Sequence, residues 1–546
     1  MPVNGRVLFF VYQRTVFVDA YRTAAQLKAK TKYEPVFLVA AGTSNLVAED
    51  IDRCKRDGIA CFTEEDFVVA APPPPQEQGW RLSVDAFRRR CFDFAKYRTL
   101  WLAMRCWKLV TIVVPRETIL SVSRIMAKRL ASRAVKRAGQ LPYLIERISG
   151  ISSEINRLRG VEARYRDTLQ HLKPDILCLS EDMPGPITGP LIKVARQLKI
   201  PTVIIPFTIP NVREAIEARY ADTWQDTWLT DYLTDHLALN MYPRWSLTYK
   251  DRELLRVRGR LAIVYERVGI APPNPWVSNS GFADRIAVES EQMLAIYRNL
   301  GFPEHQLALT GNATDDLLSE ALRESASRKY ALYTQLGLRA DLPMMLSSLV
   351  PDQIAGGVPF CEFERYDVLL WSWVEALAKW QHRYNIVLRV NPRSRWQDFL
   401  YLERLGAKVA PDDTISLMPF AEIYVASISS TLRWAAACGI PSINYDVYRY
   451  RYGDYLGAPG IVHVEKKEEF AAAIDRLAGD DVYRRELRQR QLAQAKSWGC
   501  LDGRSTERVV ALFEELRSLK GGADAGPSMV SDHSEPSPGA RTQILK

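Results

Sequence analysis

Residue types that build metal centres and disulfide frameworks are scarce in this chain. It has eight cysteines and six histidines in 546 residues. The cysteines are scattered, with no CxxC pair and no neighbouring histidine that would complete a metal-ligand spacing. This argues against structural zinc and against a disulfide-stabilised secreted protein. We therefore expect reduced thiols, no bound metal, no other cofactor and a cytoplasmic protein.

Long apolar runs and glycine-rich motifs are missing as well. The longest apolar run, residues 100–115, is interrupted by Arg105 and Lys108 and is shorter than the roughly 20 residues that a membrane helix needs. The N-terminus has no basic stretch followed by an apolar core and a cleavage site, so no signal peptide is expected. No GxGxxG follows the first apolar run, residues 6–12, which excludes a dinucleotide-binding turn of that kind.

The chain does have the length and apolar content for more than one globular core. With 47% hydrophobic residues, its 546 residues suffice for about two or three domains. The formal net charge of +9 at pH 7 favours an anionic partner, whether a nucleotide, a nucleic acid or a phospholipid surface. Charge alone does not choose among these.

Short apolar runs alternate with amphipathic segments in both halves of the chain, which is typical of parallel α/β sheets. The predicted strands of the first half are residues 6–12, 35–40, 175–180, 202–206, 285–290 and 307–312. Those of the second half are residues 344–346, 386–388, 423–426, 442–445 and 461–464. We predict an α/β protein with an N-terminal domain over 1–312, a C-terminal domain over 313–520 and a disordered tail over 521–546.

A cluster of hydroxyl side chains follows one strand of the predicted second sheet. Strand 423–426 runs into Ser429, Ser430 and Thr431, which open a predicted helix over 432–438. Unpaired backbone N–H groups at such a helix start, with hydroxyls beside them, suit a phosphate. The plainer interpretation is that these residues only cap the helix.

Polar residues also follow the neighbouring strand, 386–388. They are Arg389, Asn391 and Arg393. Because open α/β sheets bind ligands at the carboxyl ends of their strands, we expect these side chains and the hydroxyl cluster to share one edge of the sheet.

The first domain carries an acidic pair at an equivalent place. Glu181 and Asp182 directly follow the buried strand 175–180. A catalytic carboxylate belongs at such a strand end. The same pair can equally cap the next helix, and the sequence leaves both interpretations open.

A basic insertion separates the strands of the first domain, over about residues 80–166. Its segment 80–137 interleaves many Arg and Lys residues with Trp101, Trp107 and aliphatic side chains. Such a helical segment can lie on an anionic membrane surface. The alternative is a helical hairpin that packs its apolar stripe on the domain. Nucleic acid is not an expected partner, because no DNA- or RNA-binding motif is present.

The order of these motifs resembles the two-Rossmann-domain GT-B architecture, and within it the UDP-N-acetylglucosamine 2-epimerase-like branch and its glycosyltransferase relatives. The matching segments are residues 175–207, 286–318, 406–444 and 502–510. The resemblance implies two Rossmann-like domains that face a cleft, with the helical basic insertion in the first. It implies that Gly311 and Asn312 line this cleft and that Ser429, Ser430 and Thr431 hold the diphosphate of a nucleotide sugar.

The chain departs from the epimerase pattern at the acids and the histidine. Epimerases have a glutamate pair where this chain has Arg433 and Trp434, and a histidine with an arginine where it has residues 347–350. A third acid is replaced by Phe207 and Thr208. Only Asp182 has a counterpart, so epimerisation, which needs acid and base groups on both faces of the sugar carbon, is poorly supported.

The expected function is therefore a metal-independent glycosyltransferase. It would move a sugar from a nucleotide-sugar donor to a glycan or lipid-linked acceptor in surface polysaccharide synthesis, at the inner face of the membrane. Arg389 or Arg393 would neutralise the leaving phosphate, with help from Arg433, and Asp182 or Glu181 would be the base. The alternatives are an epimerase with rearranged acids and a non-catalytic binding protein.

Overall fold

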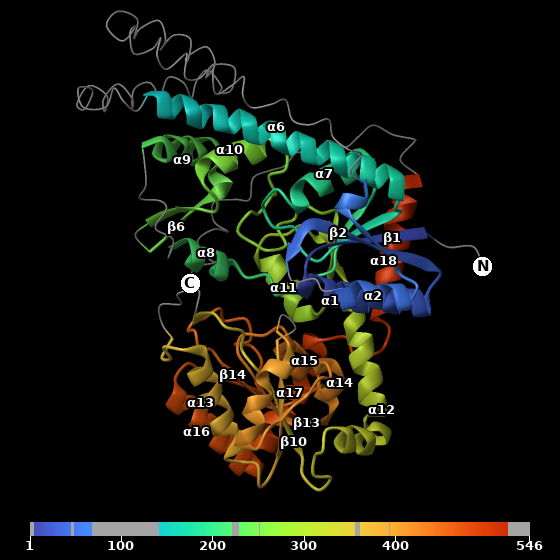
Figure 1. The fold of residues 1–546 in the computed structure, drawn as a ribbon, viewed down its shortest axis with the longest axis vertical. Coiled ribbons are helices and arrows are strands. Elements are labelled where there is room, and N and C mark those ends of the chain that lie inside the picture. The colour runs from blue at the N-terminus through green and yellow to red at the C-terminus, as the bar shows by residue number, and fades with distance from the viewer. Residues whose placement is uncertain are drawn as a thin grey trace, which may run out of the picture. The chain divides into compact units, whose positions relative to one another are not determined.

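The computed structural model describes residues 5–44, 48–67, 141–220, 229–250, 252–354, 361–391 and 394–521 (Figure 1). The chain divides into two compact units. One comprises Met1–Glu64, Leu169–Ala215 and Pro272–Lys546, and the other Glu65–Thr168 and Ile216–Ala271. The predicted membrane-binding segment 80–137 lies outside the described residues, as does the predicted tail beyond residue 521.

The first unit contains a seven-stranded sheet in the order β3-β2-β1-β4-β5-β8-β9, in which every strand pair is parallel. The strands are β1 (Gly5–Gln13), β2 (Tyr33–Ser44), β3 (Ala60–Thr63), β4 (Ile176–Leu179), β5 (Thr202–Ile204), β8 (Arg285–Val288) and β9 (Leu307–Leu309). This order, 3-2-1-4-5 from the edge, is that of a doubly wound Rossmann sheet. The apolar runs are continuous because helices cover both faces.

The same unit contains a second parallel sheet, of six strands, in the order β12-β11-β10-β13-β14-β15. The strands are β10 (Met344–Ser348), β11 (Asn385–Arg389), β12 (Lys408–Val409), β13 (Ala421–Ala426), β14 (Ser442–Tyr445) and β15 (Ile461–Val464). Counted from β10, this is again the Rossmann order. The two sheets confirm the predicted α/β class.

Helices of the first unit cover both sheets. They are α1 (Arg14–Lys30), α2 (Ala48–Arg56), α7 (Thr188–Gln197), α11 (Glu291–Asn299), α12 (Ala313–Gln335), α13 (Tyr366–Ala378), α14 (Thr414–Leu417), α15 (Thr431–Ala437), α16 (Lys467–Gly479), α17 (Asp481–Trp498) and α18 (Ser505–Gly521). The last helix, red in Figure 1, returns to the first sheet, where Leu512 and Phe513 share a buried cluster with Val7 and Phe17. The predicted division at residue 312 stays a prediction.

The second unit is mainly helical. Its elements are α6 (Leu141–Leu172), whose last residues enter the first unit, most of α8 (Val212–Tyr220), α9 (Leu229–Met241), α10 (Gly259–Val268) and the antiparallel hairpin of β6 (Ser246–Tyr249) and β7 (Arg252–Leu255). Trp245, Ala262 and Tyr265 lie in its buried core. None of the helices described is both long enough and apolar enough to cross a lipid bilayer.

Candidate functional site

The loop between β13 and α15 has a strained backbone. β13 ends at Ala426, and Ile428 then adopts φ +42°, a conformation that β-branched residues rarely occupy. Its backbone N–H donates to Asn444 Oδ1 at 2.8 Å. Strain of this kind persists only where neighbouring groups hold it, and it is common at ligand sites.

The hydroxyl groups of this loop form a directed hydrogen-bond chain. Tyr424 donates its hydroxyl to Ser348 Oγ at 2.7 Å, and the hydroxyl oxygens of Tyr424 and Thr431 lie 2.5 Å apart. Since each hydroxyl has one hydrogen, Thr431 must donate to Tyr424, and Ser429 to Thr431 at 2.7 Å. Ser430 is exposed and its side chain makes no capping bond. Two of the three predicted phosphate-binding hydroxyls are thus already engaged.

Unlike the hydroxyl groups of Ser429 and Thr431, the backbone amides of Ser429 and Ser430 are not engaged by other described residues. Neither donates a hydrogen bond to any residue within the described part of the chain. The next amide, that of Thr431, donates to Ser429 Oγ at 3.3 Å. Two successive unpaired amides at a strand end suit an anion.

A histidine helps to fix this loop. Asn444 uses its Oδ1 to accept from Ile428, so its Nδ2 lies towards His463 Nδ1 at 3.2 Å, and His463 Nε2 lies 3.2 Å from the carbonyl of Tyr455. The neutral Nε2–H tautomer satisfies all three bonds. Desolvation lowers the pKa of His463, which favours this neutral form. Tyr455 in turn donates its hydroxyl to the carbonyl of Ser429 at 2.8 Å.

A pocket of about 470 Å³ lies beside the loop. It is lined by the loops that follow β13, β14 and β15, by residues of β14 and β15 themselves, and by the first turns of α8 and α16. The lining residues are Arg213, Ile428, Asn444, Asp446, Arg451, Tyr452, Gly453, Asp454, Tyr455, Leu456, His463, Val464, Glu465 and Glu469. Its volume is within the range of small-molecule sites.

Asp454 is a residue of this pocket that sequence analysis did not single out. Its Oδ1 accepts a hydrogen bond from Asn211 Nδ2 at 2.5 Å, and its Oδ2 has no partner among the residues described. Burial raises the pKa of Asp454 to about 7, and the carboxylates of Glu214 and Asp446 contribute. The available signal was an acid within the tyrosine-rich run 448–455, which matches no motif.

Arg389 lies at the predicted edge of the second sheet. It ends β11, which β10 separates from β13. Its Nη1 donates to the carbonyl of Val390 at 2.9 Å, and its buried Nε has no partner among the described residues. Burial lowers the pKa of this guanidinium. Asn391 follows the same strand, whereas Arg393 lies outside the described residues.

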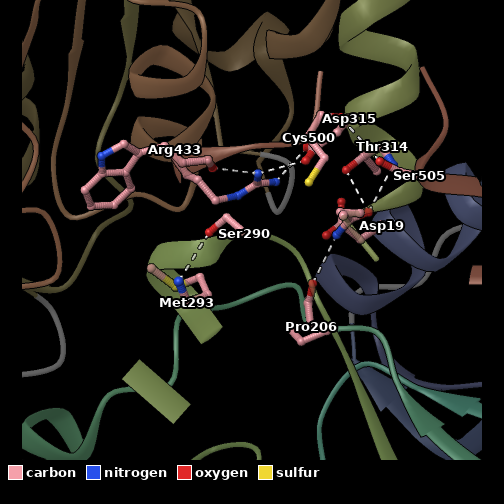
Figure 2. Close-up of polar contacts among 12 residues, drawn as sticks. Asp19, Pro206, Ser290, Met293, Thr314, Asp315, Arg433, Cys500 and Ser505 are labelled. Atoms are coloured by element: carbon pink, nitrogen blue, oxygen red, sulfur yellow. Dashed lines mark hydrogen bonds and ion pairs between the residues drawn. The ribbon is translucent and has the colours of Figure 1, made fainter. Parts of the chain in front are cut away.

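Arg433 has a partner inside the protein. It is 5% exposed, and its guanidinium contacts both oxygens of Asp315, at 2.9 and 2.8 Å, and the carbonyl of Trp498 at 3.2 Å (Figure 2). These bonds join α15 to the start of α12 and the end of α17. Arg433 could bind the donor, as the sequence predicted, only if its ion pair with Asp315 broke.

Gly311 and Asn312 are tightly packed where β9 leads into α12. Asn312 Oδ1 accepts from the backbone and hydroxyl of Thr314 at 3.0 and 2.9 Å, and its Nδ2 donates to the carbonyl of Pro206 at 3.2 Å (Figure 2). Gly311 has φ +75°, and a Cβ there would lie 2.3 Å from Ser505 Oγ. Both residues have structural roles that the resemblance did not predict.

Asp182 lies at the end of β4 as predicted, but its carboxylate is occupied. Oδ1 accepts from the backbone of Ser280 and from its hydroxyl, at 3.1 Å for the latter, and Oδ2 accepts from the backbones of Phe282 and Ala283 at 2.7 and 2.9 Å. The side chain is 2% exposed, and burial raises its pKa to about 6 in spite of these bonds. In this conformation Asp182 anchors the 280–283 loop.

Glu181 is less constrained. It is 6% exposed, and within the described part of the chain its carboxyl group makes no hydrogen bond. Burial, with smaller effects from Asp182 and Glu214, raises its pKa to about 8. The interpretation of this pair as a cap for the following helix is wrong, because α7 starts at Thr188 without a side-chain cap.

Glu289 is a second buried acid that the sequence analysis left out. It precedes Ser290, whose hydroxyl caps α11 by accepting from Met293 (Figure 2). Its buried Oε2 has no partner among the described residues, and burial raises its pKa to about 7. The positive charge of Arg433 opposes part of this rise in the pKa of Glu289.

Comparisons with known proteins identify similar folds but no family. No protein-family profile and no curated sequence matches the chain. Similar solved structures include a Neisseria meningitidis UDP-GlcNAc 2-epimerase bound to UDP-GlcNAc (11% identity, TM-score 0.47, 93% of this chain and 100% of that one). A structure of S. aureus MnaA with UDP is similar too (12% identity, TM-score 0.46, 94% of this chain and 97% of that one).

The calicheamicin glycosyltransferase CalG4 is also similar (12% identity, TM-score 0.44, 94% of this chain and 99% of that one). These names come from the two enzyme classes that the motifs resemble. At such identities and scores, the likeness carries no inference about the ligand or the reaction of this chain.

Proposed function

We propose that the protein is a glycosyltransferase that moves a sugar from a nucleotide-sugar donor to a surface-glycan acceptor. The main support is the pair of amides at Ser429 and Ser430, which have no acceptor among the described residues. They follow the carboxyl end of β13, where open α/β sheets bind ligands, and the residue that precedes them, Ile428, lines a pocket of about 470 Å³. A diphosphate would bind these amides and the exposed hydroxyl of Ser430.

A transferase without a metal needs another positive group to stabilise the phosphate that leaves. Arg389 fits this need best among the described candidates, since its Nε has no partner among the described residues and it ends β11, which lies two strands from β13 in the same sheet. Arg393 and Asn391 complete the proposed donor site. Arg433 contributes only if it separates from Asp315.

The proposed base is Glu181, with Asp182 as the alternative. The carboxyl group of Glu181 makes no hydrogen bond within the described residues, whereas four donors saturate Asp182. A pKa of about 8 leaves part of Glu181 ionised at neutral pH, and a general base works best with a pKa near the working pH.

The acceptor side rests on the sequence. The basic segment 80–137 suggests an anionic membrane surface and hence a lipid-linked or surface-bound glycan. Co-sedimentation with vesicles tests this. Binding should require anionic lipid and should weaken with salt, and equal binding to neutral vesicles would contradict it.

A screen of nucleotide sugars tests the function. We expect at least one of the UDP, CDP and GDP sugars to raise the melting temperature, because a ligand that binds only the folded state stabilises it. No sugar should be consumed until an acceptor is added. An altered sugar without acceptor would favour an epimerase instead, and no thermal shift with any compound would favour a non-catalytic protein.

A further inference from the structure

The pocket beside the β13–α15 loop contains a carboxylate that the proposed donor site does not use. Asp454 lines it, and Asn211 binds only one of its oxygens. Asn211 is itself fixed, because its Oδ1 accepts from the backbone of Glu214 in α8 at 3.1 Å. The amide orients the carboxylate and leaves Oδ2 without a partner among the described residues.

The pocket and the proposed phosphate site are adjacent. Ile428, which directly precedes the unpaired amides, lines the pocket. So does Tyr455, which donates its hydroxyl to the carbonyl of Ser429. A group attached to a phosphate at Ser429 and Ser430 would therefore extend into this space.

We propose that this pocket binds a hydroxyl-bearing ring, the sugar of the donor, and that Asp454 recognises it by accepting a hydrogen bond from a ring hydroxyl through Oδ2. The inference rests on the proposed function for the identity of the ring. Hydroxyl groups are the donors that suit an unpaired carboxylate oxygen, and Tyr452, whose side chain is both aromatic and polar, lines the same pocket.

The charge around Asp454 makes this recognition depend on pH. The titratable and charged groups around it are Arg213 and Glu214 of α8, Asp446, Arg451 and Tyr452 of the preceding loop, His463 and Glu465 in and after β15, and Glu469 of α16. Burial and the nearby acids give Asp454 a pKa of about 7. The ionised carboxylate, which is the better acceptor, is lost as the pH falls through 7.

The test measures the contribution of the sugar to affinity. Calorimetry compares UDP with UDP-N-acetylglucosamine, and CDP and GDP with their hexose conjugates, on the full chain. The Asp454→Asn variant keeps the side-chain shape but removes the charge, and Asp475→Asn, an acid outside the pocket, is the charge-matched control. We expect the ratio of diphosphate to nucleotide-sugar Kd to fall about 10- to 100-fold in Asp454→Asn only.

In the wild type this ratio should also decline from pH 8 to pH 6, and in Asp454→Asn it should stay flat. An unchanged ratio in Asp454→Asn, or a wild type in which the sugar adds nothing to diphosphate binding, overturns the inference but leaves the proposed function standing. Equal loss of diphosphate and sugar affinity would mean a merely structural role and also overturns it. If no pair binds the wild type, the proposed function fails as well.

Discussion

Gly311 illustrates how one backbone angle fixes a residue type. Its φ of +75° and the Ser505 hydroxyl, which a Cβ would meet at 2.3 Å, both exclude a side chain. Gly301 has a similar φ of +80° with no atom within 4 Å of its missing Cβ. The two glycines therefore separate the effect of strain from the effect of packing.

Gly311→Ala should lower the free energy of unfolding by about 2–4 kcal/mol, from left-handed strain plus overpacking. Gly301→Ala should lower the free energy of unfolding by only about 1–2 kcal/mol, because it adds left-handed strain without overpacking. Chemical denaturation of both variants measures the difference. Equal losses would mean that Ser505 moves away freely.

Glu181 is expected to reduce stability in a pH-dependent way. Its pKa in the folded protein, about 8, lies above the ordinary 4.5, so the fold favours the protonated acid and loses stability as the pH rises through this window. Glu181→Gln removes that loss. We expect the variant to melt higher than the wild type at pH 8, with a smaller difference at pH 5, and to lose turnover.

The melting temperatures test the burial of Glu181, and the turnover tests its role as the base. A Glu181→Gln protein with the same melting difference at both pH values would show that Glu181 is not buried as described. Full turnover in Glu181→Gln, together with loss of turnover in Asp182→Asn, would mean that Asp182 and not Glu181 is the base.

A buried arginine that pairs with an aspartate connects three helices. Arg433 of α15 binds Asp315 in the first turn of α12 and the carbonyl at the end of α17. Burying a guanidinium costs free energy that only a well-placed carboxylate offsets. The pair therefore specifies how these helices meet.

Asp315→Asn should cost about 3–5 kcal/mol of unfolding free energy, because it leaves a buried positive charge without its partner. Glu304→Gln, which breaks the exposed pair with Arg298, is the control and should have no measurable effect. If both variants unfold at the same denaturant concentration as the wild type, Arg433 is free to bind another anion.

Along the chain, the sequence predicts those structural features that depend on local pattern. Apolar runs placed β13, β14 and β15 to within two residues, because parallel strands buried on both faces need continuous apolar sequence. Ser290 and Asn312, the last residues of the predicted strands 285–290 and 307–312, instead lie beyond the ends of β8 and β9 and cap α11 and α12.

Contacts between distant residues could not be predicted in this way. Asp182 is bound by residues about 100 positions further along the chain, and Arg433 by one 118 positions away. The local sequence pattern does not indicate such pairings, so the sequence analysis treated Asp182 and Arg433 as available for the site. Asp454 was missed for the same reason, because only the folded loops bring it to the pocket.

The most direct test of the account is the backbone amide of Ser430. This residue has φ −57°, which proline also adopts, so Ser430→Pro removes the N–H with little change of backbone angle. Ser430→Ala removes the hydroxyl and keeps the amide. Calorimetry with the nucleotide sugar that binds the wild type, on variants whose melting temperatures show that they are folded, should give about 10- to 100-fold weaker binding for Ser430→Pro and a smaller loss for Ser430→Ala. Wild-type affinity in a folded Ser430→Pro protein would contradict the claim that this loop binds the donor phosphates.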